Sequence, residues 1–162
     1  MTSFLYRAPA GVAGDVTRPD DTIVESGLLN AAQAPTAFGA PVKLVSGKFE
    51  KIASGDTAAV FAGVLSRVAP SIAGDLVQTY AGGTPNTASV QGIVVKGYVN
   101  VVCTQGTPAR GGSVFVRVTA DTGKAVGDFE TAADSGKCVA LTGVTWAVDG
   151  KDASNIAEIR IA

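Results

Sequence analysis

The chain has 162 residues and a formal net charge of −1, from 13 Lys and Arg against 14 Asp and Glu. Without an excess of positive charge it has little to displace phosphate counterions, which argues against nucleic-acid binding as its main task. It contains no histidine, the commonest general base and metal ligand, and only 17% of its residues are charged, against about a quarter in typical soluble domains. We therefore expect an assembly component rather than an enzyme, with no catalytic residues, no cofactor and no metal.

Residues 1–40 lack a sustained hydrophobic pattern and are interrupted by glycine and proline. Such a segment buries too little apolar surface to offset its own ordering entropy. We expect an extended N-terminal arm that binds a partner, with Ile23-Val24 adding as a strand to an exposed sheet edge and Arg7 and Arg18 pairing with partner carboxylates. The residues expected at the partner interface are Phe4, Tyr6, Arg7, Arg18, Ile23, Val24 and Leu28.

The start of the chain has no basic region followed by an apolar stretch, so it does not resemble a signal peptide. The longest apolar run, residues 58–65, is far shorter than the roughly 20 residues of a membrane-spanning helix. We expect no contact with a membrane.

Residues 41–162 show the pattern of strands and turns and are expected to form the body, which should fold without the arm. Apolar and polar residues alternate, and glycine, proline and aspartate separate the alternating runs, which is typical of an all-β, antiparallel β-barrel or sandwich. Gly92 and Gly97 indicate a bulge or bend inside the longest run. The expected strands are 41–46, 48–53, 59–66, 89–104, 113–119, 137–148 and 155–161.

The alternation also predicts which side chains form the core. Trp146 shares a strand face with two valines and is expected to be its largest anchor. The two cysteines, Cys103 and Cys138, are interpreted as small apolar side chains with reduced thiols rather than a disulfide. The expected core residues are Val114, Val116, Val118, Val144, Trp146, Ile159 and Ile161.

Three motifs suggest chemistry only at first sight. The loop 106–113 has the spacing of a phosphate-binding loop but carries Gly112 where the lysine is required. Asp121-Thr122-Gly123 and Asp134-Ser135-Gly136 are similar to the paired loops of aspartic proteases, but they lie 134 − 121 = 13 residues apart and are also ordinary turn sequences. The acidic cluster between residues 15 and 25 lacks the ligand spacing of a calcium site. A protease therefore stays a minor alternative.

Several collinear segments resemble the structural cement (decoration) proteins of tailed bacteriophages. They span nearly the whole chain, although 68–83 and 127–137 match nothing. The segments are PAGVAGDVTR (9–18), TIVES (22–26), FGAPV (38–42), FAGVLSR (61–67), GYVNV (97–101), GSVFVRV (112–118), TADTG (119–123) and AEIRI (157–161).

The resemblance implies a virion structural protein that clamps neighbouring subunits of the major capsid protein on the outer capsid surface, after synthesis in the host bacterial cytoplasm. It also implies self-association, with a homotrimer favoured and a homodimer as the alternative. Two other readings remain beside the protease: another virion β-domain, from a tail or baseplate, or a carbohydrate-binding module. Both would require an aromatic-lined concave face, and only 6% of the residues are aromatic.

Overall fold

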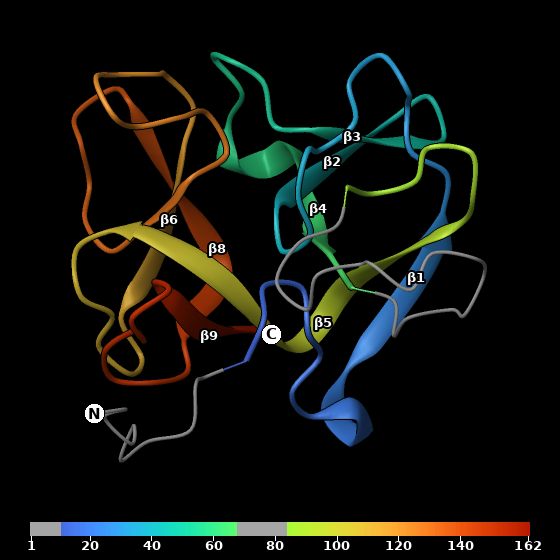
Figure 1. The fold of residues 1–162 in the computed structure, drawn as a ribbon. Helices are drawn as coiled ribbons and strands as arrows, with labels where there is room; N and C mark the ends of the chain where they lie inside the picture. The colour runs from blue at the N-terminus through green and yellow to red at the C-terminus, as the bar shows by residue number, and fades with distance from the viewer. Residues whose placement is uncertain (1–10, 68–83) are drawn as a thin grey trace, which may run out of the picture.

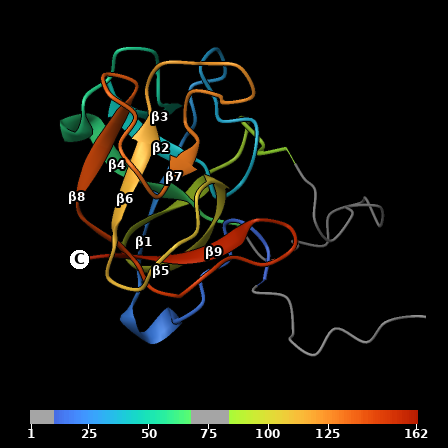
Figure 2. The ribbon, with the colours of Figure 1, turned by 90° about the vertical axis from the view of Figure 1, so that its left-hand side faces the viewer.

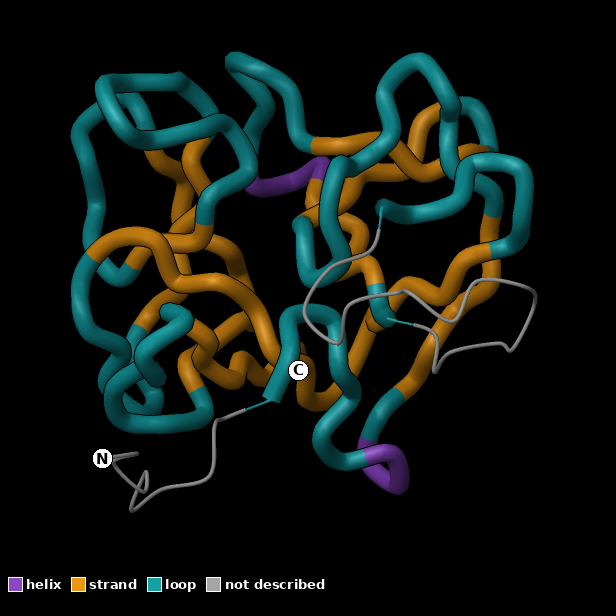
Figure 3. The backbone as a smooth tube through the Cα atoms, in the orientation of Figure 1, coloured by secondary structure: helices purple, strands orange, loops and turns teal. Residues whose placement is uncertain are grey.

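The computed structural model describes residues 11–67 and 84–162. In this part of the chain the fold is all-β, as expected, with two single-turn 3-10 helices (Figures 1 and 3). Each strand expected after residue 40 is present, and its ends lie within about two residues of the expected positions. The elements are η1 (Pro19–Asp21), β1 (Ile23–Gly27), β2 (Pro41–Val45), β3 (Lys48–Lys51), η2 (Ala58–Val60), β4 (Phe61–Leu65), β5 (Gln91–Gln105), β6 (Ser113–Arg117), β7 (Phe129–Glu130), β8 (Cys138–Trp146) and β9 (Ile156–Ile161).

The C-terminal half of β5 forms a closed barrel with β6, β7, β8 and β9. It pairs in parallel with β7, whereas the β7–β6, β6–β8 and β8–β9 pairs are antiparallel. The circle closes where β9 returns to β5, in a register that runs from Gly97 opposite Ile161 to Val102 opposite Ile156. Figure 2 shows β6, β7 and β8 near one another and β9 crossing below them. Closure leaves these strands without the open edges that invite unwanted pairing.

The N-terminal half of β5 belongs to a second group of strands. There β5 lies between β4 and β1, and β4 continues through β2 to β3. The chain following β1 then reaches β3, where Leu29 forms an isolated bridge with Phe49. The molecule therefore has two lobes, joined by the single long strand β5 (Figure 1).

The core has two parts that correspond to the lobes. A larger cluster fills the barrel and extends to Ile52 and Val64 of the second lobe. A smaller one fills the rest of the second lobe and consists of Leu29, Val42, Phe49, Leu65 and Ile93. Alternate residues of β5 serve both, since Ile93 packs in the smaller cluster and Val94 in the larger. The seven residues expected in the core are all buried there, none more than 7% exposed: Val114, Val116, Val118, Val144, Trp146, Ile159 and Ile161.

The structure differs from the expectation that residues 1–40 stand apart from the body. The N–H of Gly14 donates to Asn100 O, β1 pairs with β5, and Leu29 is only 2% exposed. Residues 11–18 thus pack on the barrel half of β5 and residues 22–40 belong to the second lobe, and the strand edge to which Ile23 and Val24 add is the molecule's own. Local patterning did not reveal this because the apolar partners come from strands more than 15 residues away.

β5 bends at Gly97, where the sequence predicted a bend or bulge. Its φ of +108° is unfavourable for any residue with a side chain. The space above it is also filled, because a Cβ there would lie 2.6 Å from Asp21 O, next to the start of β1. Gly97 therefore lets η1 and β1 pack directly on the backbone of the bend.

Replacing Gly97 by alanine should lower the stability of the fold by more than the backbone strain at a positive φ would cause by itself. Gly55 provides the matched control, since it has a φ of +80° but nothing within 4 Å of the position that a Cβ would occupy. We expect about 1–2 kcal/mol from the strain in Gly55→Ala and a larger loss in Gly97→Ala, where the backbone at Asp21 must also move. Urea denaturation measures both, and equal losses would contradict the close-packing argument.

Candidate functional site

β1 is an edge strand whose side chains remain largely uncovered. Among the described residues its backbone pairs only with β5, and every residue from Ile23 to Ser26 is exposed. The exposed fractions of Ile23 and Val24 are 55% and 44%, and that of Leu28, just beyond the strand, is 44%. Apolar side chains on an uncovered edge strand are typical of a protein-binding surface. We call Ile23, Val24 and Leu28 the β1 surface.

The β1 surface is held rigidly by its neighbours. Gly27, opposite Gln91, leaves room for the Phe49 ring, which a Cβ at this position would overlap. Phe49 N donates to Leu28 O at 2.9 Å, and Leu29 enters the core beside it. The strand is thus formed before any partner arrives, which lowers the entropic cost of binding.

Arg18, expected to pair with a partner carboxylate, is engaged within the molecule. Its Nη2 lies 3.0 Å from the Oε2 atom of Glu158, whose side chain is 8% exposed, and its guanidinium stacks on Tyr98, 3.9 Å from the ring centroid. Thr17 donates a second hydrogen bond to the same carboxylate. The structure therefore gives Arg18 an internal role, that of fixing the chain before η1 on the outside of the barrel.

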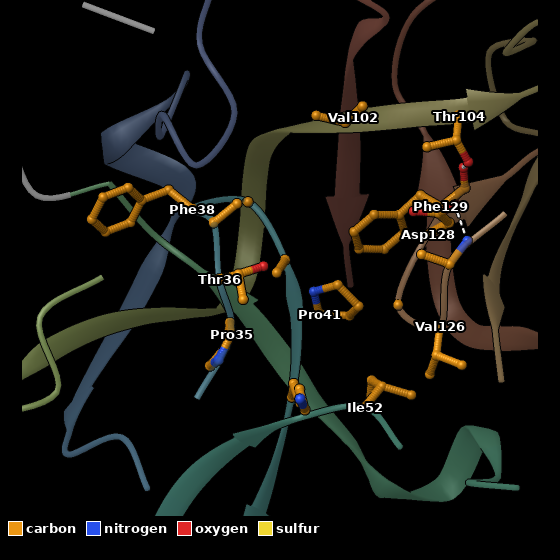
Figure 4. Close-up of a pocket in the computed structure, with 16 residues that line it drawn as sticks. Pro35, Thr36, Phe38, Pro41, Ile52, Val102, Thr104, Val126, Asp128 and Phe129 are labelled. Carbon is orange, nitrogen blue, oxygen red and sulfur yellow. Dashed lines mark hydrogen bonds between the residues drawn. The ribbon is translucent and has the colours of Figure 1, made fainter. Parts of the chain in front are cut away.

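A pocket of about 310 Å³ lies between the two lobes (Figure 4). Pro35, Phe38 and Pro41 form one wall, while Ile52 and Phe129 come from the other side. Two of its polar groups are already used: Asp128 accepts from Ala125 N at 2.8 Å, and Thr104 donates to Phe129 O at 3.3 Å. The rest of the lining is mainly apolar, with Lys51 as its cation, so the walls offer chiefly packing surface.

A buried ion network lies at the end of the barrel. The guanidinium of Arg117 is fully buried; its Nη2 contacts Glu130 Oε2 at 3.0 Å and Asp134 Oδ2 at 2.8 Å. Its Nη1 also donates to Thr119 O at 3.2 Å. The hydrogen bonds to Glu130 raise the pKa of Arg117 further above its usual range, so the charge is permanent. This network connects β6 and β7 to the loop that leads into β8.

The aspartates of the two Asp-x-Gly loops each form ion pairs in or beside this network. Asp134 pairs with Arg117 and, at 3.5 Å, with Lys124, whereas Asp121 pairs with Lys137. The hydrogen bond from Arg117 lowers the pKa of Asp134, and the one from Lys137 lowers the pKa of Asp121. An aspartic protease dyad requires two carboxylates that share one proton. Here each carboxylate is kept charged by its own cation, which does not fit that chemistry.

The same contacts predict a loss of stability in acid. A carboxylate with a pKa lowered by folding stabilises the native state above its ordinary pKa, and this contribution disappears as the pH falls through the lowered value. We expect the melting temperature to drop below about pH 4, and Asp121→Asn and Asp134→Asn to lower it at pH 7 while reducing the acid-dependent drop. Melts at pH 7 and pH 3 measure this, and an unchanged drop in both variants would contradict it.

Other candidate chemistry is sparse in the described ranges 11–67 and 84–162. They contain no cluster of three or more Cys, Asp or Glu side chains placed to hold a metal ion, and none of their helices is long and apolar enough to cross a membrane. Cys103 is buried and Cys138 half-buried, both as free thiols. Burial raises the pKa of both thiols, and Glu130 raises that of Cys138 further, so neither is an activated nucleophile.

The residues expected at the partner interface thus have different positions. Ile23, Val24 and Leu28 form the β1 surface, Arg18 is paired internally, and Phe4, Tyr6 and Arg7 lie outside the described residues. Sequence reasoning missed Arg110 and Arg160, which line a pocket beside Arg18. Arg160 was visible as an outward charge on the last strand, but nothing local indicated that Arg110 lies next to it.

Comparison with known proteins places the chain beside phage capsid proteins in both sequence and structure. A family model described as XM1 gp53 minor capsid protein matches residues 1–161. A chain from the solved structure "The capsid of Myoviridae Phage XM1" is similar to this one with a TM-score of 0.69 and 15% sequence identity, covering 98% of this chain and 94% of that chain. No curated protein is similar enough to match. The structural match shows a common fold over nearly the full length, and the family match covers almost every residue.

Proposed function

The chain belongs to the XM1 gp53 minor capsid protein family, and we propose that it cements the phage capsid by clamping neighbouring subunits of the major capsid protein. Its role as a structural component of a phage capsid follows from the family. The clamping action and the position on the outer surface of the shell are the proposal. A tail or baseplate domain and a carbohydrate-binding module have less support, because the family is one of capsid proteins.

The observation that supports clamping best is the β1 surface. A strand that is fixed along one edge yet exposes Ile23 at 55% and Val24 at 44% has the form of a docking element. An incoming strand of a capsid subunit could pair with the edge of β1 that no described residue occupies, while the side chains of β1 set the register. An interface of about 1,000–2,000 Å² is sufficient for specific protein–protein binding, and this strand with its surroundings can supply part of it.

Several contacts made at once would hold such a protein on the capsid even where the affinity of each single contact is low. We favour a homotrimer on the capsid, with a homodimer as the alternative, because linked copies that grip adjacent subunits gain from a high effective concentration. Residues Phe4, Tyr6 and Arg7 of the N-terminal segment are proposed as further contacts with the shell. Sedimentation equilibrium of the free protein and of protein released from capsids would establish the number of subunits in the oligomer.

The test mixes undecorated capsids with the purified chain and measures co-sedimentation and the melting temperature of the shell. The wild type should bind in a saturable way and raise the shell's melting temperature. Ile23→Thr/Val24→Thr keeps two β-branched residues but removes apolar surface, so it should weaken binding about tenfold or more at an interface centre.

The matched control is Leu44→Thr/Val45→Thr, which alters two equally exposed apolar residues, 56% and 40%, on β2 of the second lobe. It should bind as the wild type does. Saturable binding without any stabilisation of the shell would contradict cementing, and equal binding by both double variants would exclude the β1 surface as the contact.

A further inference from the structure

A second surface, on the outside of the barrel, gathers positive charge around Tyr98. A pocket of about 190 Å³ is lined by Arg18, Arg110 and Arg160 together with Tyr98 and Trp146. A neighbouring pocket of about 170 Å³ shares Tyr98 and Arg160 and adds Lys96 and Asp21. We call the two adjoining pockets the basic groove, which stands out in a chain whose net charge is −1.

The strand order explains why these side chains meet. Tyr98 on β5 lies opposite Arg160 on β9, and Arg160 lies opposite Thr145 on β8, so all three point outward from adjacent barrel strands. Arg110 is brought to them by its loop, because Gly111 N donates to Trp146 O at 2.8 Å and Asp149 Oδ1 accepts from Arg110 N at 2.9 Å. The groove is therefore built on a rigid frame.

The cations of this groove differ in whether a carboxylate of the molecule already pairs with them. Arg18 is neutralised by Glu158 and stacks on Tyr98. Arg160 has a ring contact at 6.0 Å from the Tyr98 centroid, and, among the described residues, neither its side chain nor those of Arg110 and Lys96 form an ion pair. Two guanidinium groups that face one pocket without a carboxylate partner are suited to bind an anion in two-point geometry.

Trp146 also lines the first pocket, although its side chain is part of the barrel core. Trp146 is 1% exposed, and its Nε1 has no partner among the described residues. A Cβ at Gly112 would lie 3.8 Å from Trp146 Cδ1, the atom next to Nε1, so this edge of the indole faces the 110–112 turn. Trp146 therefore forms the inner side of the pocket wall, and its indole signal reports on changes at the 110–112 turn.

We infer that this basic groove binds a carboxylate side chain from an acidic segment of a neighbouring capsid protein. The pocket has the volume for one such group, and Glu158 on Arg18 shows the same pairing inside the molecule. A nucleic acid needs a wide basic surface, which a chain with a net charge of −1 does not supply beyond this groove. The groove also continues into the start of β1, since Ile23 pairs with Lys96, so one partner could contact both surfaces.

The first experiment uses the full chain labelled with ¹⁵N and a synthetic tetraglutamate peptide as the probe. Trp146 is the single tryptophan of the sequence, so its indole N–H gives one assignable signal. We expect a saturable shift of this signal and of the Arg110 and Arg160 amides. Arg110→Gln/Arg160→Gln should weaken the peptide about tenfold or more, because two charge-assisted contacts are lost.

The charge-matched control is Lys48→Gln/Lys51→Gln, which removes two exposed lysines from β3 in the other lobe and should bind the peptide as the wild type does. Tetraglutamine and inorganic phosphate complete the comparison. The inference is overturned if tetraglutamate gives no saturable shift, if phosphate or a short single-stranded DNA saturates the site more tightly, or if both double variants bind the peptide equally.

The second experiment rests on the proposed function and compares the same variants on undecorated capsids at low and high salt. Arg110→Gln/Arg160→Gln should bind more weakly and lose part of the salt dependence. If the wild type binds capsids and this variant binds identically, the groove is not the contact, whereas cementing stands. If the wild type fails to bind capsids, the proposed function fails, and the peptide titration still decides the chemistry of the groove.

Discussion

Arg117→Met is expected to destabilise the protein by about 3–5 kcal/mol, because it leaves the carboxylate of Glu130, only 3% exposed, buried without its cation. A loss of this size is a large part of the roughly 5–15 kcal/mol that holds a typical domain folded. Asp134 contributes less to the penalty, since its side chain is 33% exposed and water can solvate it.

The double variant Arg117→Met/Glu130→Leu separates the cost of an orphaned charge from the value of the pair. Apolar residues of similar volume commonly replace a buried ion pair at little cost. We therefore expect the double variant to recover most of the stability lost in Arg117→Met, as measured by urea denaturation of both proteins. If Arg117→Met costs under about 1 kcal/mol, or if the double variant is the less stable of the two, this account of the network is wrong.

Trp146→Ala is the second substitution with a large expected effect, about 3–5 kcal/mol, from lost burial and the cavity left in the barrel. Trp146→Phe should cost much less, because it keeps most of the apolar surface and removes an N–H that has no partner among the described residues.

Chemical denaturation of the two variants measures the difference, and the emission maximum of the folded wild type provides a check on burial. At 1% exposure the single indole should emit well to the blue of free tryptophan. Emission at the wavelength of an indole in water, or equal destabilisation by alanine and phenylalanine, would show that Trp146 does not anchor the core in this way.

The sequence predicted the structure best in strands where buried and exposed side chains alternate along the chain. Val114, Val116 and Val118 alternate along one run of the chain, and that pattern reports which face is buried regardless of which strands flank it. The bend at Gly97 was also predictable from local sequence, because a glycine inside a strand weakens it unless the backbone needs a bend or bulge there. The strands of the body other than β7, and the seven core residues expected above, could therefore be predicted from residue order alone.

The features that could not be predicted depend on distant partners. Leu29 is buried by Phe49 and other residues of the second lobe, so the segment around it has no periodicity of its own and was interpreted as an arm. β7 has only two residues, too few to show a period, and it is positioned by pairing with β5 and β6. Arg110 and Arg160 line one pocket only because the turn of Arg110 is bonded to Trp146 of β8 and β8 pairs with β9.

The shared strand β5 also imposes an order of events on folding. Its first half is flanked by β1 and β4, which precede it in the chain, whereas its second half pairs with β7 and β9, which follow. On the ribosome the smaller lobe can assemble once residue 96 has emerged, but the barrel must wait for β9, whose contacts with β5 close a loop of roughly 50 residues or more. Pulsed hydrogen exchange during refolding should accordingly protect the amides of residues 91–95 before those of β9, residues 156–161; the reverse order would show that the barrel forms first.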